Sequence, residues 1–193
     1  MSLFNRNREH EEFERLSARV APDLYNMALR LTRNVDGAKD LLQDALLRAF
    51  EKFHQFQTGS NFKAWSFRIL FTIFYNQYKR QRKELRSVSL DQLIDQQDST
   101  WEPRSWERTP EEWLLASMMD EPVERALRDL PNEYRDVVLL VDVQGLSYED
   151  AAIALDVPIG TIRSRLFRGR LQLRSALREH AARLGYLDEG ARP

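Results

Sequence analysis

Arginines are concentrated near the C-terminal end of the chain. Residues 159–178 hold six arginines and no acidic residue. A guanidinium group presents its N–H donors in a planar fork, which matches the paired acceptors of a guanine edge and the oxygens of a phosphate. The six are Arg163, Arg165, Arg168, Arg170, Arg174 and Arg178. Their types and spacing therefore predict a surface for a polyanion such as nucleic acid.

Apolar residues divide this segment into two helical faces. Four of them recur at helical spacing and predict an inward stripe: Ile162, Leu166, Leu173 and Leu177. The N–H groups at the start of such a helix, near Thr161, favour phosphate. The predicted base contacts on the outward face are Arg163, Ser164, Phe167 and Arg168, and the predicted phosphate contacts are Arg165, Arg170 and Arg174.

A second basic block lies in the N-terminal half. Residues 61–86 hold seven basic residues and a single acid, Glu84, whereas residues 91–124 hold ten acids and only two arginines. The net charge of -1 therefore hides a segregation of charge along the chain. Two basic blocks separated by an acidic one indicate two polyanion-binding surfaces, joined by a segment that DNA repels.

Composition excludes several classes of protein. With 42% hydrophobic and 31% charged residues, the 193-residue chain is typical of globular proteins. No apolar run approaches the length of a membrane span, and the N-terminus is polar, so we expect a cytoplasmic protein without membrane insertion. The absence of cysteine excludes disulfides and cysteine-based zinc sites. His10, His54 and His180 lie in unrelated segments, so no catalytic residue, metal site or cofactor is predicted.

The hydrophobic pattern predicts an all-α chain of two small helical domains. Residues 10–86 predict a three-helix domain, whose third helix, over about 62–86, follows a loop with two possible N-caps, Ser60 and Asn61. Residues 87–120 predict a flexible acidic linker, because Pro103 and Pro110 lie among acids and the periodicity fades. Three tryptophans in this linker indicate that it docks in its working complex: Trp101, Trp106 and Trp113.

Residues 121–185 predict a four-helix domain. Its helices are expected over about 122–130, 131–144, 148–155 and 160–184, with Gly145 ending the second and Ser147 with Asp150 forming a capping box for the third. The third helix is rich in alanine, and a turn of three or four residues separates it from the arginine-rich helix. An arginine-rich helix is also compatible with a solvated face, a membrane surface or an acidic partner. The short turn favours a helix-turn-helix that binds DNA.

Both halves of the chain resemble one known family, the extracytoplasmic-function (ECF) sigma factors of the sigma-70 family. Their minus-35 recognition segment is similar to PIGTIRSRLFRGRLQLR, and the segment before it resembles LPNEYRDVVLLVDVQGLSYEDAAIAL. Their minus-10 module is similar to SNFKAWSFRI. The resemblance implies an alternative sigma factor that binds core RNA polymerase, directs promoter-specific initiation in a stress response and is held inactive by an anti-sigma factor.

In this family, the loop before the third helix captures a base flipped from the non-template strand. The matching residues offer rings for stacking and polar groups for a base edge: Phe56, Thr58, Ser60, Asn61 and Phe62. The following helix could track the phosphates of this minus-10 strand with Lys63, Arg68, Asn76, Lys79 and Arg80. Four further aromatic residues are expected in the core: Trp65, Phe71, Phe74 and Tyr75.

A polar face of the predicted second helix carries one leucine. Its residues recur at i, i+3 and i+4 spacing: Asp40, Gln43, Asp44, Leu47 and Glu51. The family resemblance covers this helix, in ALRLTRNVDGAKDLLQDALLRAFEKFHQF, and implies that it binds the coiled coil of the largest polymerase subunit, while the second domain binds the flap. Without the resemblance, a solvated acidic face with one stray leucine is the simpler interpretation.

The length of the linker is compatible with two promoter contacts. A spacer of about 17 base pairs, which the family implies, spans roughly 58 Å. The 34 residues from 87 to 120 reach at most about 110 to 120 Å when extended. The tether can therefore bridge both promoter elements.

Two interpretations remain open at this point. Within the family, the motifs are most similar to the branch controlled by zinc-binding, thiol-redox anti-sigma factors, which implies GGAAT-like minus-35 and GTT-like minus-10 sequences. Outside the family, a helix-turn-helix repressor or a response-regulator output domain would explain the C-terminal half. It would leave the basic, aromatic N-terminal domain without a role. Binding to core polymerase separates a sigma factor from a repressor.

Overall fold

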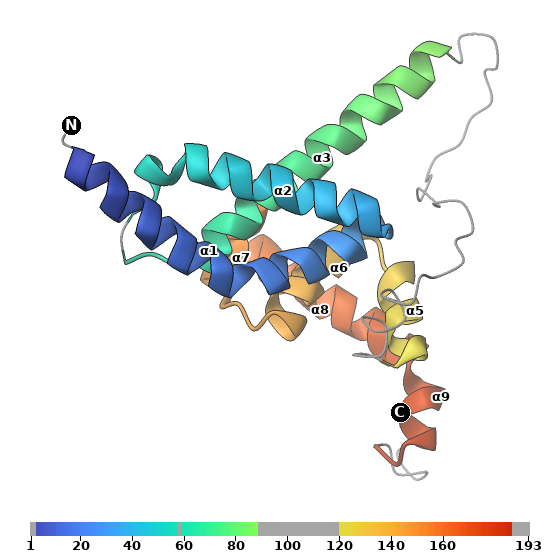
Figure 1. Cartoon of the computed structure of the whole chain (residues 1–193). Coiled ribbons are helices and arrows are strands. Elements are labelled where there is room, and N and C mark those ends of the chain that lie inside the picture. Colours follow the sequence, from blue (N-terminus) through green and yellow to red (C-terminus); the bar gives the residue numbers. More distant parts are fainter. Residues whose placement is uncertain (1–2, 58, 89–119, 187–193) are drawn as a thin grey trace. The chain divides into compact units, whose positions relative to one another are not determined.

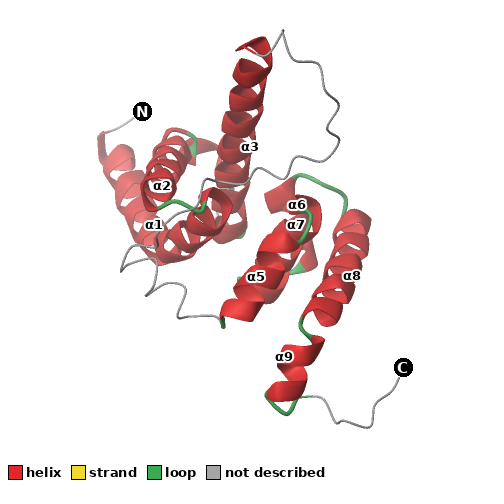
Figure 2. Ribbon diagram, turned by 90° about the vertical axis from the view of Figure 1, so that its right-hand side faces the viewer, coloured by secondary structure: helices red, strands yellow, loops and turns green. Residues whose placement is uncertain are grey.

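The computed structural model describes residues 3–57, 59–88 and 120–186, shown as coloured ribbon in Figure 1. Within these ranges the secondary structure is helical and contains no strand (Figure 2). The chain divides into two compact units, Met1–Glu107 and Arg108–Pro193, and the boundary between them falls within the predicted linker. The expected all-α fold of two helical domains is confirmed. The linker tryptophans lie outside the described residues.

The first unit contains three long helices. They are α1 (Leu3–Thr32), α2 (Val35–Glu51) and α3 (Phe62–Val88), with the short 3-10 helix η1 (Phe53–Gln55) after α2. α1 packs along α2, and α3 contacts both (Figure 1). The mostly apolar α3 supplies Phe67 and Leu70 to the buried core, as its sequence predicts. It ends two residues beyond the predicted position.

Asparagine side chains begin two of these helices. Asn34 Oδ1 accepts hydrogen bonds from the backbone N–H groups of Asp36 (2.8 Å) and Gly37 (3.2 Å) and so caps α2. Asn61 Oδ1 accepts hydrogen bonds from the backbone N–H groups of Lys63 (3.0 Å) and Ala64 (3.3 Å) at the start of α3. Of the two predicted caps for α3, Asn61 is therefore the one that the structure uses.

The second unit contains five helices and one π-helical turn within the described residues. They are α5 (Glu121–Asp129), α6 (Asn132–Val138), the π turn η2 (Leu139–Val143), α7 (Tyr148–Leu155), α8 (Ile159–Ala176) and α9 (Arg178–Arg183). The predicted second helix is thus α6 continued by a π turn, and Gly145 (φ 68°) ends it in the left-handed region, as expected. The core of this unit comes from α6, η2 and α8, whose Val137, Leu140 and Ile162 are fully buried.

The predicted last helix, over 160–184, is wrong in one respect. It is two helices, because α8 ends at Ala176 and α9 begins at Arg178. Neither glycine nor proline marks the break at Leu177, so the sequence carries no local signal for it. The break leaves His180 Nε2 of α9 3.3 Å from Asp120 Oδ2, at the start of α5.

Candidate nucleic-acid interface

α7 and α8 form a helix-turn-helix. The Ser147 hydroxyl accepts a hydrogen bond from the Asp150 backbone N–H (3.0 Å) and donates one to the Asp150 carboxylate (2.9 Å), so Ser147 caps α7 with Asp150 as its partner, although the second bond comes from the hydroxyl and not from the backbone N–H of a capping box. Asp156 ends α7 in the left-handed region (φ 55°), and α8 begins three residues later. Buried Ala151 and Ala154 on α7 allow its contact with α8.

The outward face of α8 is exposed, as its spacing predicts. Phe167 is 70% exposed and Leu171 is 57% exposed, although both are large and apolar. Around them lie the exposed polar residues Arg163, Ser164, Arg168 and Arg174. On the inward side Ile162 and Leu166 are buried, whereas Leu173 and Leu177 are only half-buried. An exposed phenylalanine among arginines has the composition expected of a surface that contacts base edges and phosphates.

Three arginines of α8 contact residues of α6 and η2. Arg165 forms an ion pair with Glu133 (3.1 Å), and the Arg168 guanidinium donates a long hydrogen bond to the Tyr134 hydroxyl (3.5 Å). Arg170 Nη2 and Nε donate to the two oxygens of Asp142, at 2.6 and 3.1 Å.

These contacts also change the acidity of two of the arginines. The hydrogen bond to Tyr134 raises the pKa of Arg168, and the hydrogen bonds to Asp142 raise the pKa of Arg170, so both remain cations. The sequence predicted the arginines but not these partners.

Gly169 determines how closely α8 approaches α6, and sequence reasoning missed it. The glycine is buried between the two helices. A Cβ built on it would lie 2.8 Å from Val138 Cγ2 and 3.4 Å from the carbonyl oxygen of Tyr134. A glycine inside a helix pattern is the only signal in the sequence that could have indicated this close contact.

The predicted minus-10 loop is built on a cluster of aromatic side chains. Phe56 stacks on Phe53 of η1, with ring centroids 5.7 Å apart, and contacts Phe62 and Trp65 at 5.3 Å each. Phe62 is 6% exposed and also contacts Phe13 of α1. Its ring is therefore part of the core and not an outward stacking surface, because the cluster covers it. Phe56 remains half-buried at the surface of the cluster.

The expected burial of the other aromatic residues is correct only in part. Phe71 is buried, whereas Trp65, Phe74 and Tyr75 are half-buried. Trp65 contacts both Phe56 and Phe62 and so forms part of the support beneath the loop.

The polar residues of the same loop hold its backbone. The Ser60 hydroxyl donates to the Gln57 carbonyl oxygen (2.7 Å), and the Asn61 side-chain oxygen caps α3. Gly59 adopts φ 91°, which a residue with a side chain rarely does. Thr58 lies outside the described residues. Among the described residues of the loop, Ser60 is thus bonded to Gln57, and Asn61 is bonded to the first turn of α3.

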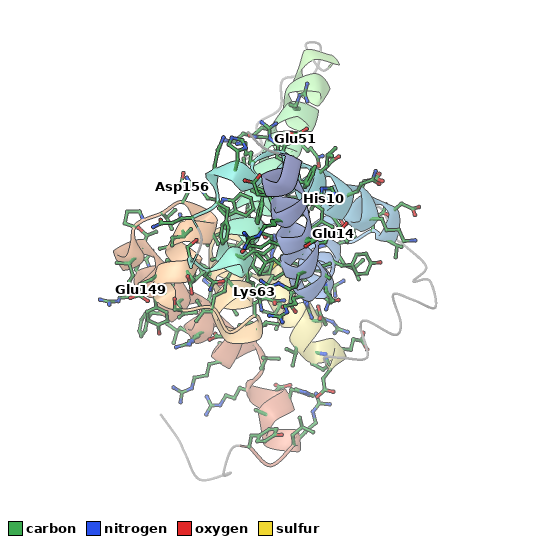
Figure 3. The ribbon with its side chains drawn as sticks, turned by 60° about the vertical axis from the view of Figure 1, so that its left-hand side comes forward. His10, Glu14, Glu51, Lys63, Glu149 and Asp156 are labelled. Carbon is green, nitrogen blue, oxygen red and sulfur yellow. The ribbon has the colours of Figure 1, made fainter. Side chains whose placement is uncertain are left out.

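The basic residues of α3 follow the loop on one helix. Lys63, labelled in Figure 3, lies on the first turn and forms an ion pair with Asp23 of α1 (2.8 Å). The other predicted strand contacts are exposed along α3: Arg68, Asn76, Lys79 and Arg80. The side chains of the last basic residues of this helix lie outside the described part.

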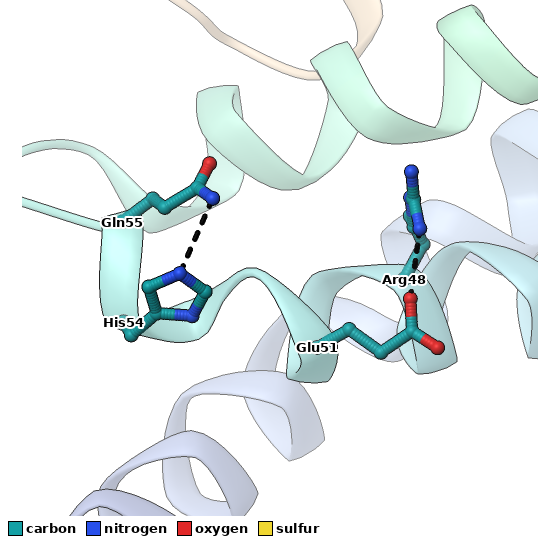
Figure 4. Close-up of polar contacts among 4 residues, drawn as sticks. All are labelled: Arg48, Glu51, His54 and Gln55. Atoms are coloured by element: carbon teal, nitrogen blue, oxygen red, sulfur yellow. Dashed lines mark hydrogen bonds and ion pairs between the residues drawn. The ribbon is translucent and has the colours of Figure 1, made fainter.

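The predicted polymerase-binding face of α2 is exposed. Leu47 is 57% exposed, and its four polar companions are exposed as well: Asp40, Gln43, Asp44 and Glu51. Gln77 of α3 donates to the Asp44 carboxylate (3.2 Å). Glu51 forms an ion pair with Arg48 at 2.9 Å (Figure 4). Figure 4 also shows the contact between the side chains of His54 and Gln55 in η1, the short helix that follows α2. This face therefore combines acidic groups with an unburied leucine.

Comparison with known proteins assigns both units. The family model for Sigma-70 region 2 matches residues 16–84, and the model for Sigma-70, region 4 matches residues 120–173. The ECF RNA polymerase sigma factor EcfG of Rhodopseudomonas palustris is 35% identical over 82% of this chain and 81% of its own length. This chain belongs to the ECF sigma factors. The family consists of transcription initiation factors, not enzymes.

Other relatives of this ECF sigma factor agree. It is 34% identical over 88% of its length to the ECF RNA polymerase sigma factor SigE of Mycolicibacterium smegmatis, but spans only 63% of that longer protein. The sigma factor RpoE of Bartonella quintana, solved in complex with the anti-sigma factor NepR, matches with a TM-score of 0.66 at 32% identity, over 87% of this chain and 98% of that one. CnrH, solved in complex with the cytosolic domain of CnrY, has the same fold (TM-score 0.61, 21% identity, over 88% and 90% of the two chains).

No helix in the described part of this ECF sigma factor is long and apolar enough to cross a membrane.

Proposed function

We propose that this ECF sigma factor binds core RNA polymerase and directs promoter-specific initiation through one DNA contact in each unit. The observation that carries the proposal is the pairing, in one chain, of an exposed arginine face on a helix-turn-helix with a capped loop and basic helix in the other unit. A protein with a single DNA-binding domain would need only the arginine face on the helix-turn-helix. The matches to sigma-70 regions 2 and 4 support the same division.

In the second unit, we assign α8 to the minus-35 duplex. The proposed base contacts are Arg163, Ser164, Phe167 and Arg168, which are exposed on one face. Thr161 lies in the first turn of α8, where backbone N–H groups favour phosphate, and Arg174 extends the same face. Arg170 belonged to the predicted set, but its guanidinium already donates hydrogen bonds to both carboxylate oxygens of Asp142, so we do not assign it to phosphate.

In the first unit, we assign the loop at 56–61 to a base of the opened minus-10 strand. Phe56 is the remaining aromatic surface, because Phe62 is buried. Ser60, Asn61 and Thr58 supply polar groups, and since the Asn61 oxygen caps α3, its amide nitrogen is the group we assign to the base. The strand would continue along exposed Arg68, Asn76, Lys79 and Arg80, with Lys63 at the start.

We assign the exposed face of α2 to core polymerase. Asp40, Gln43, Asp44, Leu47 and Glu51 would contact the coiled coil of the largest subunit, and the second unit would contact the flap. An exposed leucine among acids fits a protein surface better than a DNA surface, because phosphate repels carboxylates.

Regulation by an anti-sigma factor completes the proposal. A relative at 32% identity is solved in complex with the anti-sigma factor NepR, which supports a protein inhibitor for this chain too. We further propose a cytoplasmic role in a stress response. The finer prediction, an anti-sigma factor of the zinc-binding thiol-redox type with GGAAT-like and GTT-like promoter elements, rests on the motif resemblance alone.

Gel filtration with core polymerase, followed by in vitro transcription from a promoter library, tests the proposal. We expect the chain to comigrate with core enzyme and to select promoters with a shared pair of elements. A chain that binds duplex DNA but does not comigrate with core enzyme would be a repressor of the helix-turn-helix class. Adding a reduced thiol-redox anti-sigma factor or a NepR-like protein then tests the kind of regulator.

A further inference from the structure

Two acidic residues, one on α6 and one on η2, contact the DNA-facing helix α8. Glu133 of α6 pairs with Arg165, and Asp142 of η2 pairs with Arg170 in a two-bond geometry. We name Glu133 and Asp142 the acid clamp. By contrast, Arg163 and Arg174 form no ion pair with any residue in the described part of the chain. The arginines of α8 are thus divided into paired and solvent-facing groups.

We propose that the acid clamp keeps Arg165 and Arg170 from binding phosphate and thereby weakens the part of DNA binding that does not depend on sequence. The inference rests on the proposed role of α8 at the minus-35 duplex. It adds Glu133 and Asp142 as residues that determine specificity without touching a base.

Asp142 holds Arg170 through both of its carboxylate oxygens. Both carboxylate oxygens accept hydrogen bonds, at 2.6 and 3.1 Å, and the two bonds occupy two of the five N–H donors of the guanidinium. Two-bond pairs of this kind are the strong form of the ion pair. Because the pair has no net charge, it releases no counterion from DNA in the way that a lone arginine does.

The Glu133–Arg165 pair acts in the same direction. Arg165 is one of the less exposed arginines of α8, since 28% of its side chain is accessible, and its partner lies on the first turn of α6. Removing either acid would leave an arginine of α8 without a carboxylate to balance its positive charge. The two acids therefore set how many cations the helix presents to phosphates.

Arg168 differs from the clamped arginines. Its partner is the neutral Tyr134 hydroxyl, so Arg168 keeps its charge. The single long hydrogen bond leaves four of its five donors for a base edge. The structure thus separates arginines that can contact base edges from arginines whose charge is balanced by a paired carboxylate.

The salt dependence of DNA binding tests the clamp. The full chain is titrated into a labelled duplex that carries a GGAAT-like element and into a scrambled duplex, between 50 and 200 mM salt. We expect Asp142→Asn to steepen the plot of log affinity against log salt by about 0.9, the value for one added phosphate contact, on both duplexes. Adding Glu133→Gln should steepen it by about 0.9 again.

Glu121→Gln is the matched control. It also removes one acid from this unit, but Glu121 forms an exposed pair with Arg125 on α5. The slope should stay at the wild-type value. A control slope that rises as much as that of Asp142→Asn would mean that only net charge matters, and would overturn the proposal.

Replacing both partners, Asp142→Asn together with Arg170→Gln, gives an independent decision, because it removes the arginine without leaving an unpaired carboxylate beside the DNA. We expect the wild-type slope to be unchanged, because the clamped arginine contacts no phosphate. A slope that falls by about 0.9 would show that Arg170 contacts phosphate while paired, and the clamp would be wrong. If the wild type binds both duplexes equally, the proposed promoter readout fails while these slopes still decide the clamp. If neither the wild type nor the variant with Asp142→Asn and Glu133→Gln binds DNA, both the proposed role of α8 and the acid clamp are wrong.

Discussion

Gly169 of α8 and Val138 of α6 lie so close that a Cβ on the glycine would be 2.8 Å from Val138 Cγ2. Real Cβ atoms essentially never make such a contact, and a backbone oxygen, that of Tyr134, lies 3.4 Å from the same position. The approach at Gly169 places α8 within reach of Glu133, Tyr134 and Asp142. One missing side chain therefore makes the contacts of the arginine helix possible.

Gly169→Ala should destabilise the second unit. Overpacking costs about 1 to 3 kcal/mol, and the better helix propensity of alanine returns at most about 1 kcal/mol. We expect a net loss of up to about 2 kcal/mol in the free energy of unfolding, measured by urea denaturation. Gly160→Ala is the control on the same helix, since nothing lies within 4 Å of its Cβ, and it should be neutral or stabilising. Equal effects of the two changes would contradict the role of Gly169.

Asn61 should combine a structural and a functional role. Asn61→Ala removes the cap of α3 and should cost about 1 kcal/mol of stability. Asn61→Asp keeps a capping oxygen but loses the amide donors, so its stability should match the wild type. Both variants should impair open-complex formation, measured by permanganate footprinting, while binding to minus-35 duplex stays intact. If the Asn61→Asp variant opened promoters normally, Asn61 would act only as the cap of α3 and not in base recognition.

Arg168→Ala should weaken binding to the preferred promoter duplex by about 5- to 150-fold and relax the preference at one base pair. The exposed side chain makes the effect one of recognition and not of folding. Tyr134→Phe, which removes only the hydroxyl that contacts Arg168, should have a smaller effect at the same base pair. Fluorescence anisotropy with duplexes that vary each position measures both. An equal loss on all sequences would make Arg168 a phosphate contact.

Leu47→Asp should reduce affinity for core polymerase by about tenfold or more without changing the stability of the chain. Leu47 is 57% exposed, so its replacement leaves no cavity. Leu184→Asp makes the same change in the second unit, because Leu184 is also exposed, at 52%, and lies at the end of α9. Comigration with core enzyme on gel filtration compares the two variants. A loss confined to Leu184→Asp would move the main polymerase contact from α2 to the second unit.

Local patterns in the sequence were sufficient for much of the fold. The i, i+4 recurrence of Ile162 and Leu166 predicted the buried side of α8, because a helix repeats every 3.6 residues whatever surrounds it. Ser147 with Asp150, and Asn61 before α3, predicted helix starts for the same reason: a cap bonds to groups two or three residues away. The segregation of charge also needed no structure.

Only the tertiary structure determines which side chains contact the residues that the sequence singled out. Phe62 has an aromatic ring that could stack on a base, but in the structure this ring is buried and contacts Phe13 of α1. Arg170 and Asp142 are 28 residues apart, and Arg168 and Tyr134 are 34 apart, so no periodicity relates them. Their distances depend on how α8 crosses α6, which depends on Gly169. Helix periodicity and caps are local properties of the chain, whereas which arginines are paired with a carboxylate depends on contacts made only after the helices pack.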